Sequence, residues 1–158
     1  MIRVAIPDDL DFLDRHDPLL ERSILADKIR RAEVYVAEDR GERVGLARFE
    51  YFCDLDPFLS LVMVLEPHRR RGFGRQLLEY WEADMQRRGH RLVLTSTQAD
   101  EEAQHFYRAL GYTDCGCIFF PGQTPAELVL VKRLTGDEGA TGPRQKPPPE
   151  RRQGSIET

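Results

Sequence analysis

Seven residues near the middle of the chain combine glycines and arginines in a way that suits anion binding. Residues 69–75 read Arg-Arg-Arg-Gly-Phe-Gly-Arg, with glycines at Gly72 and Gly74. An apolar segment precedes them and a helical pattern follows, so backbone N–H groups and the positive end of a helix are expected to converge there. Glycine also lets a ligand approach the backbone closely, because it has no Cβ. This turn therefore predicts a phosphate-binding site.

Two other kinds of phosphate-binding loop fit the turn less well. A nucleotide P-loop needs Gly-x-x-x-x-Gly-Lys followed by Ser or Thr, a pattern that the sequence lacks. The dinucleotide fingerprint needs a third glycine where Leu77 stands. Two alternatives stay open at this point: a basic, solvated turn with a glycine hinge, and a nucleic-acid contact made by Arg69, Arg70 and Arg71.

The cysteines do not indicate a disulfide or a metal site. Cys53, Cys115 and Cys117 make an odd number in a chain without a secretory signal, so reduced and partly buried thiols are expected. Cys115 and Cys117 are expected to point to one side of a strand, but zinc needs two more ligands that the sequence does not offer. We therefore predict no metal.

The elements on either side of the glycine turn must position it. Residues 58–65 form an apolar run that predicts a central strand buried on both faces, ending at Glu66 and Pro67. After the turn, apolar residues recur on one face of a helix that ends near Gly89. These residues are Phe73, Leu77, Leu78, Trp81 and Met85.

The remaining pattern extends this alternation along the chain. Asp17 and Pro18 suit the N-cap and the first position of a helix that runs to about Arg31. The predicted order is strand, two helices, three strands, helix, strand, helix and two strands. The sequence thus indicates an α/β (α+β) fold with about seven strands and about four helices.

Composition indicates one domain followed by a tail. The chain has 158 residues, of which 41% are apolar, enough for one sizeable core. Residues 135–158 hold four of the 10 prolines and four of the 12 glycines but no aromatic residue. Such a segment cannot offset its ordering entropy by burying apolar surface. We predict a domain over residues 1–134 and a disordered tail over residues 135–158.

Charge and hydropathy exclude some classes of protein. The 23 Lys and Arg residues against 27 Asp and Glu leave a net charge of -4, which disfavours a dedicated nucleic-acid-binding protein. No apolar run approaches the roughly 20 residues that span a bilayer. The N-terminus also lacks the long apolar region of a signal peptide. A cytoplasmic protein without membrane or nucleic-acid partners is therefore expected.

The glycine turn resembles motif A of the GCN5-related N-acetyltransferase (GNAT) superfamily, whose pattern is Gln/Arg-x-x-Gly-x-Gly/Ala. Arg69, Gly72 and Gly74 match this pattern. Residues 103–112, Ala-Gln-His-Phe-Tyr-Arg-Ala-Leu-Gly-Tyr, resemble the family's second motif, Ala-x-x-(aromatic or Leu)-Tyr-x-x-x-Gly-Phe/Tyr. With the order of elements, the resemblance covers about residues 2–134.

The resemblance implies a fold and a co-substrate. The fold would be a mixed, mostly antiparallel sheet with a splay between its fourth and fifth strands. The co-substrate would be acetyl-CoA, with its pantetheine arm along the edge of the central strand and its pyrophosphate at the glycine turn. Asp100 stands where the family often has an asparagine near the second motif. The implied cofactor-binding residues are Val62, Met63, Val64, Arg69, Arg70, Arg71, Gly72, Phe73, Gly74, Arg75 and Asp100.

The implied activity is transfer of the acetyl group to a primary amine by direct attack in a ternary complex. A phenol can give a proton to the departing thiolate, and Tyr107 in the second motif is the residue expected to do so. For the general base we predict Glu66, with Asp54 and Asp56 as competing candidates. Thr95 stands where some members have a carboxylate.

Two readings of function follow from the resemblance. In the first, the partner is an amine acceptor, either a small molecule or the amino group of a peptide or protein. The alternative is a non-catalytic CoA-binding module that acts as a sensor or interaction domain. Because family members commonly dimerise, the resemblance also raises the option of a homodimer.

Overall fold

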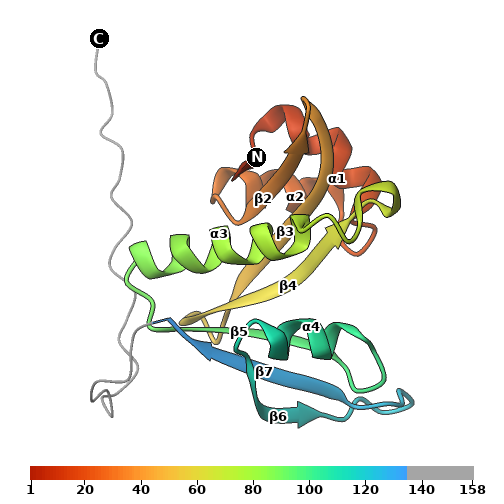
Figure 1. Cartoon of the computed structure of the whole chain (residues 1–158), viewed down its shortest axis with the longest axis vertical. Helices are drawn as coiled ribbons and strands as arrows, with labels where there is room; N and C mark the ends of the chain where they lie inside the picture. The colour runs from red at the N-terminus through yellow and green to blue at the C-terminus, as the bar shows by residue number, and fades with distance from the viewer. Residues whose placement is uncertain (135–158) are drawn as a thin grey trace.

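A computed structural model describes residues 1–134, and the predicted tail lies outside the described residues. Seven strands form one sheet in the order β1-β2-β3-β4-β5-β7-β6 (Figure 1). The strands are β1 (Ile2–Val4), β2 (Val34–Asp39), β3 (Glu42–Phe52), β4 (Asp56–Val64), β5 (Leu92–Gln98), β6 (Thr113–Ile118) and β7 (Glu127–Arg133). All neighbouring strands pair antiparallel except β4 and β5, which are parallel. The mixed, mostly antiparallel sheet confirms the predicted fold class.

Four α-helices and two short 3-10 helices accompany the sheet (Figure 1). They are η1 (Pro7–Asp9), α1 (Leu10–His16), α2 (Arg22–Arg30), η2 (Glu66–His68), α3 (Phe73–Arg87) and α4 (Ala103–Ala109). In the described part of the chain, no helix has the length and apolar character needed to span a membrane.

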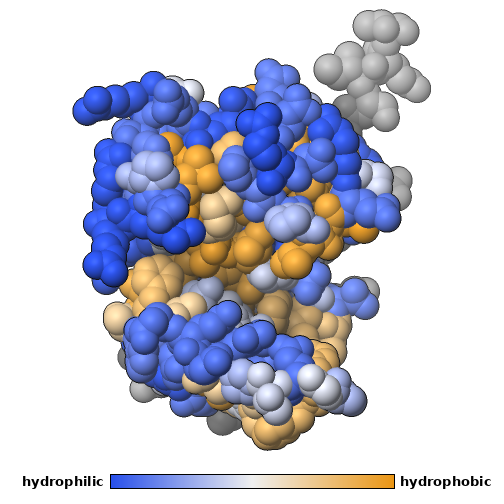
Figure 2. Space-filling model, turned by 90° about the vertical axis from the view of Figure 1, so that its right-hand side faces the viewer, coloured by the Kyte–Doolittle hydropathy of each residue, from blue (hydrophilic) through white to orange (hydrophobic). Residues whose placement is uncertain are grey.

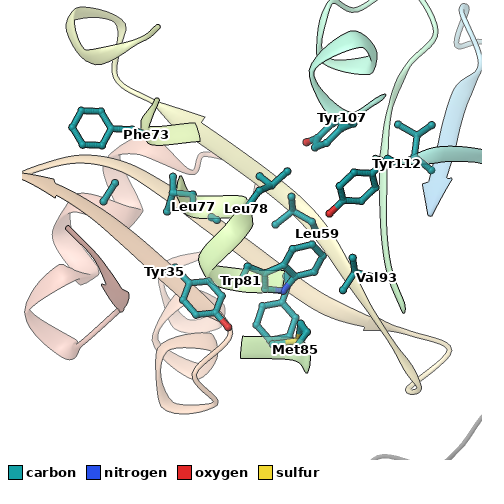
Figure 3. Packing of buried hydrophobic residues seen from close by; sticks show 14 of the residues in the cluster. Tyr35, Leu59, Phe73, Leu77, Leu78, Trp81, Met85, Val93, Tyr107 and Tyr112 are labelled. Carbon is teal, nitrogen blue, oxygen red and sulfur yellow. The ribbon is translucent and has the colours of Figure 1, made fainter. Parts of the chain in front are cut away.

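Helix α3 builds the larger of two hydrophobic clusters, as its amphipathic pattern predicts. Its stripe is buried and packs with residues of β2, β3, β5 and α4 (Figure 3). Trp81 is fully buried and its ring lies 6.1 Å from that of Phe49. Burying one such large apolar side chain contributes about 1.5–3 kcal/mol. This packing fixes α3, and therefore the turn that precedes it, against the sheet.

The smaller cluster lies on the other face of β1 to β4, under α1 and α2. It contains Leu13, Leu25, Ile29, Val36 and Leu46. Neighbouring residues of β2 and β3 alternate between the two clusters, as side chains of a strand alternate between the faces of a sheet. The first four strands are therefore covered on both faces.

The connection between α1 and α2 differs from the prediction. Asp17 does not begin the second helix: it follows the last residue of α1, and α2 begins only at Arg22. Asp17 is fully buried, and Arg48 Nε of β3 donates to its Oδ2 at 2.6 Å. A buried carboxylate needs a cationic partner more than a helix needs a cap, so the tertiary contact decides its position.

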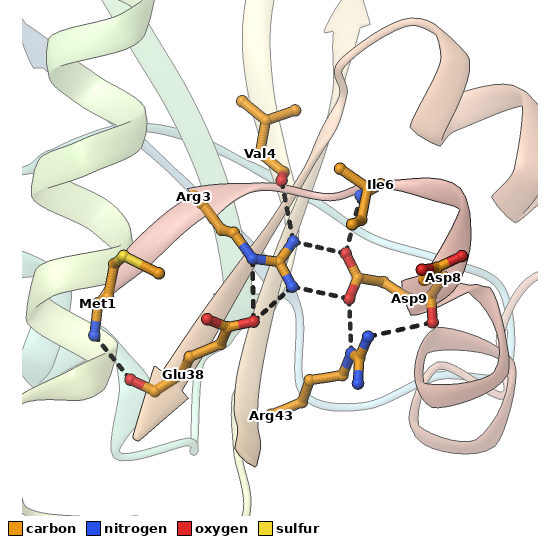
Figure 4. Close-up of polar contacts among 8 residues, drawn as sticks. All are labelled: Met1, Arg3, Val4, Ile6, Asp8, Asp9, Glu38 and Arg43. Atoms are coloured by element: carbon orange, nitrogen blue, oxygen red, sulfur yellow. Dashed lines mark hydrogen bonds and ion pairs between the residues drawn. The ribbon is translucent and has the colours of Figure 1, made fainter. Parts of the chain in front are cut away.

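A second buried carboxylate fixes the N-terminus. Asp9 is fully buried and accepts hydrogen bonds from Arg3 Nη1 at 2.7 Å, Arg43 Nε at 2.5 Å and the N–H of Ile6 at 2.8 Å (Figure 4). Burial alone would raise the pKa of Asp9, but the hydrogen bonds from Arg3, Ile6 and Arg43 outweigh it and lower the pKa to about 2. Asp9 is therefore ionised at neutral pH, and β1, η1 and β3 are joined through it.

The cysteines lie elsewhere than expected. Cys53, Cys115 and Cys117 are all free, as predicted, but all three are exposed rather than partly buried. Cys53 lies in the turn between β3 and β4, and the other two lie on β6, where every residue is exposed. A strand at the edge of the sheet with no helix over it leaves its thiols in contact with solvent.

Candidate active site at the seam between β4 and β5

The parallel strands β4 and β5 are joined only at one end. Phe58 pairs with Leu94 and Leu59 with Thr95, and the strands then diverge. We call the diverging segments, residues 60–64 of β4 and 96–98 of β5, the seam. Seen from its open end, the molecule is hollowed between two largely hydrophilic halves, and the hollow has a hydrophobic lining (Figure 2). The central strand is therefore only partly buried along the seam, not buried on both faces as predicted.

Backbone groups of β4 point into the seam at alternate residues. The N–H of Leu65 donates to Val44 O of β3 at 2.8 Å. Because antiparallel pairing alternates, Val62 and Val64 turn their N–H and C=O groups away from β3 and toward the seam. Met63 does not join them: its backbone faces β3 and its side chain packs with the cluster under α1 and α2. Val62 and the N–H of Val64 thus offer a free edge to an amide-bearing ligand, whereas the carbonyl oxygen of Val64 already accepts from Arg69.

The glycine turn forms the open end of the seam. Gly72 has a φ of 87°, a left-handed conformation that a residue with a Cβ adopts only with strain, and it precedes the first residue of α3. The first N–H groups of a helix, here those of Phe73, Gly74 and Arg75, have no intrahelical partners. No side chain caps this helix, so these groups stay free. Three free donors and the helix dipole make a site for a phosphate group.

Gly74 brings three elements together at this point. A Cβ on Gly74 would lie 3.6 Å from Phe106 Cζ of α4 and 3.9 Å from Val64 Cγ2 of β4. The first turn of α3 therefore lies directly beside the free edge of β4 and beside the second motif. An elongated ligand bound at the turn could therefore extend directly along β4 into the seam.

The four arginines of the turn do not act alike. Arg71 Nη2 donates to Asp39 Oδ2 at 2.8 Å, and Arg69 Nε donates to Val64 O at 3.0 Å. Arg75 lies 3.8 Å from Glu79, with both side chains exposed. Arg70 is exposed and has no ion-pair partner within residues 1–134. Within residues 1–134, neither Arg69 nor Arg70 has a carboxylate to match its charge, and Arg70 also makes no hydrogen bond, so its side chain is left for an anion.

Tyr107 lies at the joined end of the seam. It is 5% exposed, and its hydroxyl lies close to that of Thr95. Thr95 Oγ1 in turn donates to Leu59 O at 3.1 Å, so α4, β5 and β4 are linked where the strands begin to separate. The pKa of Tyr107 is raised, mainly because the side chain is buried. The negative charge of Glu101 raises this pKa further, whereas the neighbouring Thr95 lowers it. Tyr107 is therefore a neutral hydrogen-bond donor at physiological pH.

The predicted general base does not lie near Tyr107. Glu66 is exposed in η2, seven residues beyond Leu59, or about 20 Å at the rise of an extended strand. Asp54 and Asp56 precede the joined segment in the turn between β3 and β4 and at the start of β4. The structure therefore does not bring Tyr107 and Glu66 together, because one lies at each end of the seam.

One carboxylate near Tyr107 was not predicted. Glu101, just before α4, accepts from Thr97 Oγ1 at 2.6 Å and from the N–H of Gln98 at 3.3 Å. Its neighbour Asp100 is exposed in the same turn, at the open side of β5. The sequence signal was weak, since an acid at the start of a short helix usually serves only the helix. No cluster of three or more possible metal ligands occurs in residues 1–134.

Comparisons with known proteins agree with this geometry. A family model described as "Acetyltransferase (GNAT) domain" matches residues 30–114, more than half of the chain. A search of curated proteins found no match.

Solved structures show the same fold at low sequence identity. The Ard1 protein of Thermoplasma volcanium is 19% identical with a TM-score of 0.73, over 86% of this chain and 98% of that one. A ribosomal-protein-alanine N-acetyltransferase from Brucella melitensis is 23% identical with a TM-score of 0.70, over 84% and 99%. An aminoglycoside 6'-N-acetyltransferase complexed with coenzyme A is 16% identical with a TM-score of 0.73, over 88% and 99%. With the family match, the seam, the glycine turn and the second motif lead to one conclusion: the chain belongs to the GNAT family of acetyltransferases.

Proposed function

We propose that this protein transfers the acetyl group of acetyl-CoA to a primary amine by direct attack in a ternary complex. The observation that carries the proposal is the position of Tyr107, a buried neutral phenol at the joined end of the seam, with the anion site of α3 at the open end. An elongated ligand with a phosphate at one end and a reacting group at the other fits such a path.

The residues of the chain divide the task along this path. The N–H groups of Phe73, Gly74 and Arg75 would hold the pyrophosphate, and the free edge at Val62 and Val64 would pair with the pantetheine amides. The thioester supplies an activated acyl group and a thiolate leaving group. Tyr107 would donate to the sulfur as negative charge develops there.

The diverging segments offer no side chain that could act as the general base for the amine. The diverging segments of β4 and β5 contain no Asp, Glu or His. We propose that the amine loses its proton to water in the hollow. The nearby carboxylate of Glu101 acts on Tyr107 instead, since its negative charge raises the pKa of that phenol. Glu66 has no part in this step, because it lies at the other end of the seam.

The same observation favours a second candidate. A CoA-binding module without turnover would also need the anion site and the free edge, but it would need no base at the seam. As a sensor or interaction domain it would bind CoA and acetyl-CoA without transferring the acyl group.

Two measurements on the full chain separate these functions. Thermal stabilisation by CoA tests the anion site, and release of free thiol from acetyl-CoA with a broad panel of amines tests transfer, with the acetylated product identified by mass spectrometry. Stabilisation together with thiol release supports transfer. Stabilisation without release across the panel supports the binding module, and no stabilisation contradicts both.

A further inference from the structure

Arg48 is a buried cation with unused hydrogen-bond donors. It lies on β3 and is 4% exposed. Its Nε donates to Asp17 Oδ2 at 2.6 Å, but neither Nη atom has a hydrogen-bond partner in the described part of the chain. Neither Nη is fully closed off from solvent. A guanidinium carries five N–H donors. The four N–H groups on the two Nη atoms of Arg48 therefore lie in a nearly closed site and are available to bind a ligand.

The position of Arg48 relates it to the seam. It pairs with Leu61 of β4, and the next pair, Phe49 with Leu59, skips Ser60, so β4 bulges there. Arg48 is therefore level with the point where β4 leaves β5, one pair beyond the junction of Leu59 and Thr95.

The side chain of Arg48 points to the face opposite Tyr107. Its partner Asp17 follows α1, and α1 and α2 cover that face of the first four strands. Tyr107 belongs to the cluster built by α3 on the other face. If the coenzyme uses the face of α3 and α4, an acceptor must reach the seam from the face where Arg48 lies.

Arg3 shows that an arginine in this protein can hold two carboxylates at once. Its Nη atoms donate to both oxygens of Asp9 at 2.7 and 2.9 Å, while Nε also donates to Glu38 Oε1 at 3.0 Å (Figure 4). Arg48 has the Nε contact to Asp17 but no second carboxylate. The planar pair of Nη donors matches the two oxygens of a carboxylate better than those of any neutral group.

From this juxtaposition we propose that the Nη atoms of Arg48 form a carboxylate-binding subsite for the acceptor. The acceptor is then an amine that also bears a carboxylate, which is an amino acid or a similarly small amino carboxylic acid. This inference rests on the proposed acetyl transfer and names its substrate class. Polyamines and other purely cationic amines would leave the Nη donors unpaired and are disfavoured by the same contact.

The test compares acceptors that differ only in the carboxylate. Lysine with cadaverine, phenylalanine with phenethylamine and tryptophan with tryptamine are suitable pairs, used with acetyl-CoA and the full chain. We expect at least one pair in which kcat/KM for thiol release is about ten-fold or more higher for the amino acid. Thermal stabilisation of the protein by each compound provides a reading of binding that does not need turnover.

The variants must not leave Asp17 buried without a partner, which can prevent folding. The double variant Asp17→Asn with Arg48→Gln removes both charges and retains groups that can bond to each other. Lys28→Gln with Glu33→Gln is the matched control, because it also removes a buried ion pair but leaves Asp17 and Arg48 unchanged. We expect the carboxylate preference to disappear in the double variant and to persist in the control.

The outcomes separate this inference from the proposed function. Carboxylate-dependent binding that requires Arg48, without thiol release from any acceptor, would leave the subsite standing and remove acetyl transfer. Turnover of amines with no carboxylate preference would keep acetyl transfer and overturn the subsite. A preference that survives in the double variant, or no binding or turnover preference in any pair, would overturn it as well.

Discussion

The two halves of the sheet are built differently, and the site lies between them. Strands β1 to β4 have α1 and α2 on one face and α3 on the other, whereas β5, β7 and β6 have α4 on one face. In the first half most of β2 and β3 is buried, while all six residues of β6 are exposed. Where the half that is covered on both faces meets the half that is covered on one, β4 and β5 diverge and a ligand can enter along the free edge of β4.

Buried charges follow the same division. The first half contains the buried pairs of Asp17 with Arg48 and Glu33 with Lys28, and it contains the buried Asp9, whose partner Arg3 is partly exposed.

One buried carboxylate joins the halves. Glu82 of α3 accepts from Tyr112 Oη at 2.9 Å and from Lys132 Nζ of β7 at 2.5 Å. The halves are thus held together at the joined end and through α3, so the other end of the seam stays open.

The largest expected effect concerns the seam itself. Tyr107→Phe removes the donor to the sulfur, and we expect kcat for thiol release to fall about 100-fold or more, with the affinity for CoA unchanged. Tyr112→Phe is the matched control: its hydroxyl bonds to Glu82 in the core, so its loss should lower stability by about 1 kcal/mol and leave kcat unchanged. Steady-state kinetics and thermal unfolding measure both, and equal kcat values for the two variants would remove Tyr107 from the mechanism.

The next effect concerns the stability of the half with β1 to β4 at acidic pH. The pKa of Asp9 is about 2 in the folded protein and near 3.8 when unfolded, so the stabilisation is fully present above about pH 5 and is lost as the pH falls through 2. The loss attributable to Asp9 should be about 2 kcal/mol, measured by denaturant unfolding at several pH values. Asp9→Asn should be less stable at pH 5 and should lack this part of the acid dependence. An identical pH dependence in the variant and the wild type would contradict the assignment.

A smaller effect separates the two ends of α3. Gly72 and Gly89 both have left-handed φ values, 87° and 91°, at the start and just after the end of this helix. Replacing either with alanine should cost about 1–2 kcal/mol of stability. Only Gly72→Ala should also weaken CoA binding, by about ten-fold, because it displaces the free N–H groups of the anion site. Calorimetric titration distinguishes them, and equal CoA affinities would show that the turn is not the binding site.

The smallest effect concerns charge at the turn. Arg70→Ala should weaken CoA binding about three-fold and make it less sensitive to salt, since an exposed charge contributes less than about 1 kcal/mol. Arg91→Ala is the control, because Arg91 is also exposed and has no ion-pair partner within residues 1–134 but lies beyond the other end of α3. Binding titrations at low and high salt measure the difference. If the two variants lost equal affinity, the effect would reflect net charge rather than a contact.

Part of this arrangement was predictable from the sequence because local pattern encodes it. The apolar spacing of Phe73, Leu77 and Trp81 predicted α3, and the glycines at Gly72 and Gly74 predicted a turn that a ligand can approach. Glu66 was predicted as the general base because it follows the central strand, but position in the sequence does not give the distance along the seam, and the structure puts Glu66 and Tyr107 at opposite ends of it. Thr95 and Glu101 were not predicted as partners of Tyr107, since their contacts join segments that only the fold brings together.

By itself the sequence determined the elements, their order and the family motifs, because periodicity and turn residues act over a few neighbouring positions. The tertiary structure alone decided how far β4 and β5 stay paired, that Val62 and Val64 face the seam and that Met63 does not. It also placed Asp17 against Arg48 rather than at the start of a helix. Burial makes an unpaired charge far more costly than an uncapped helix, so contacts between distant residues overrule local preference where charges are buried.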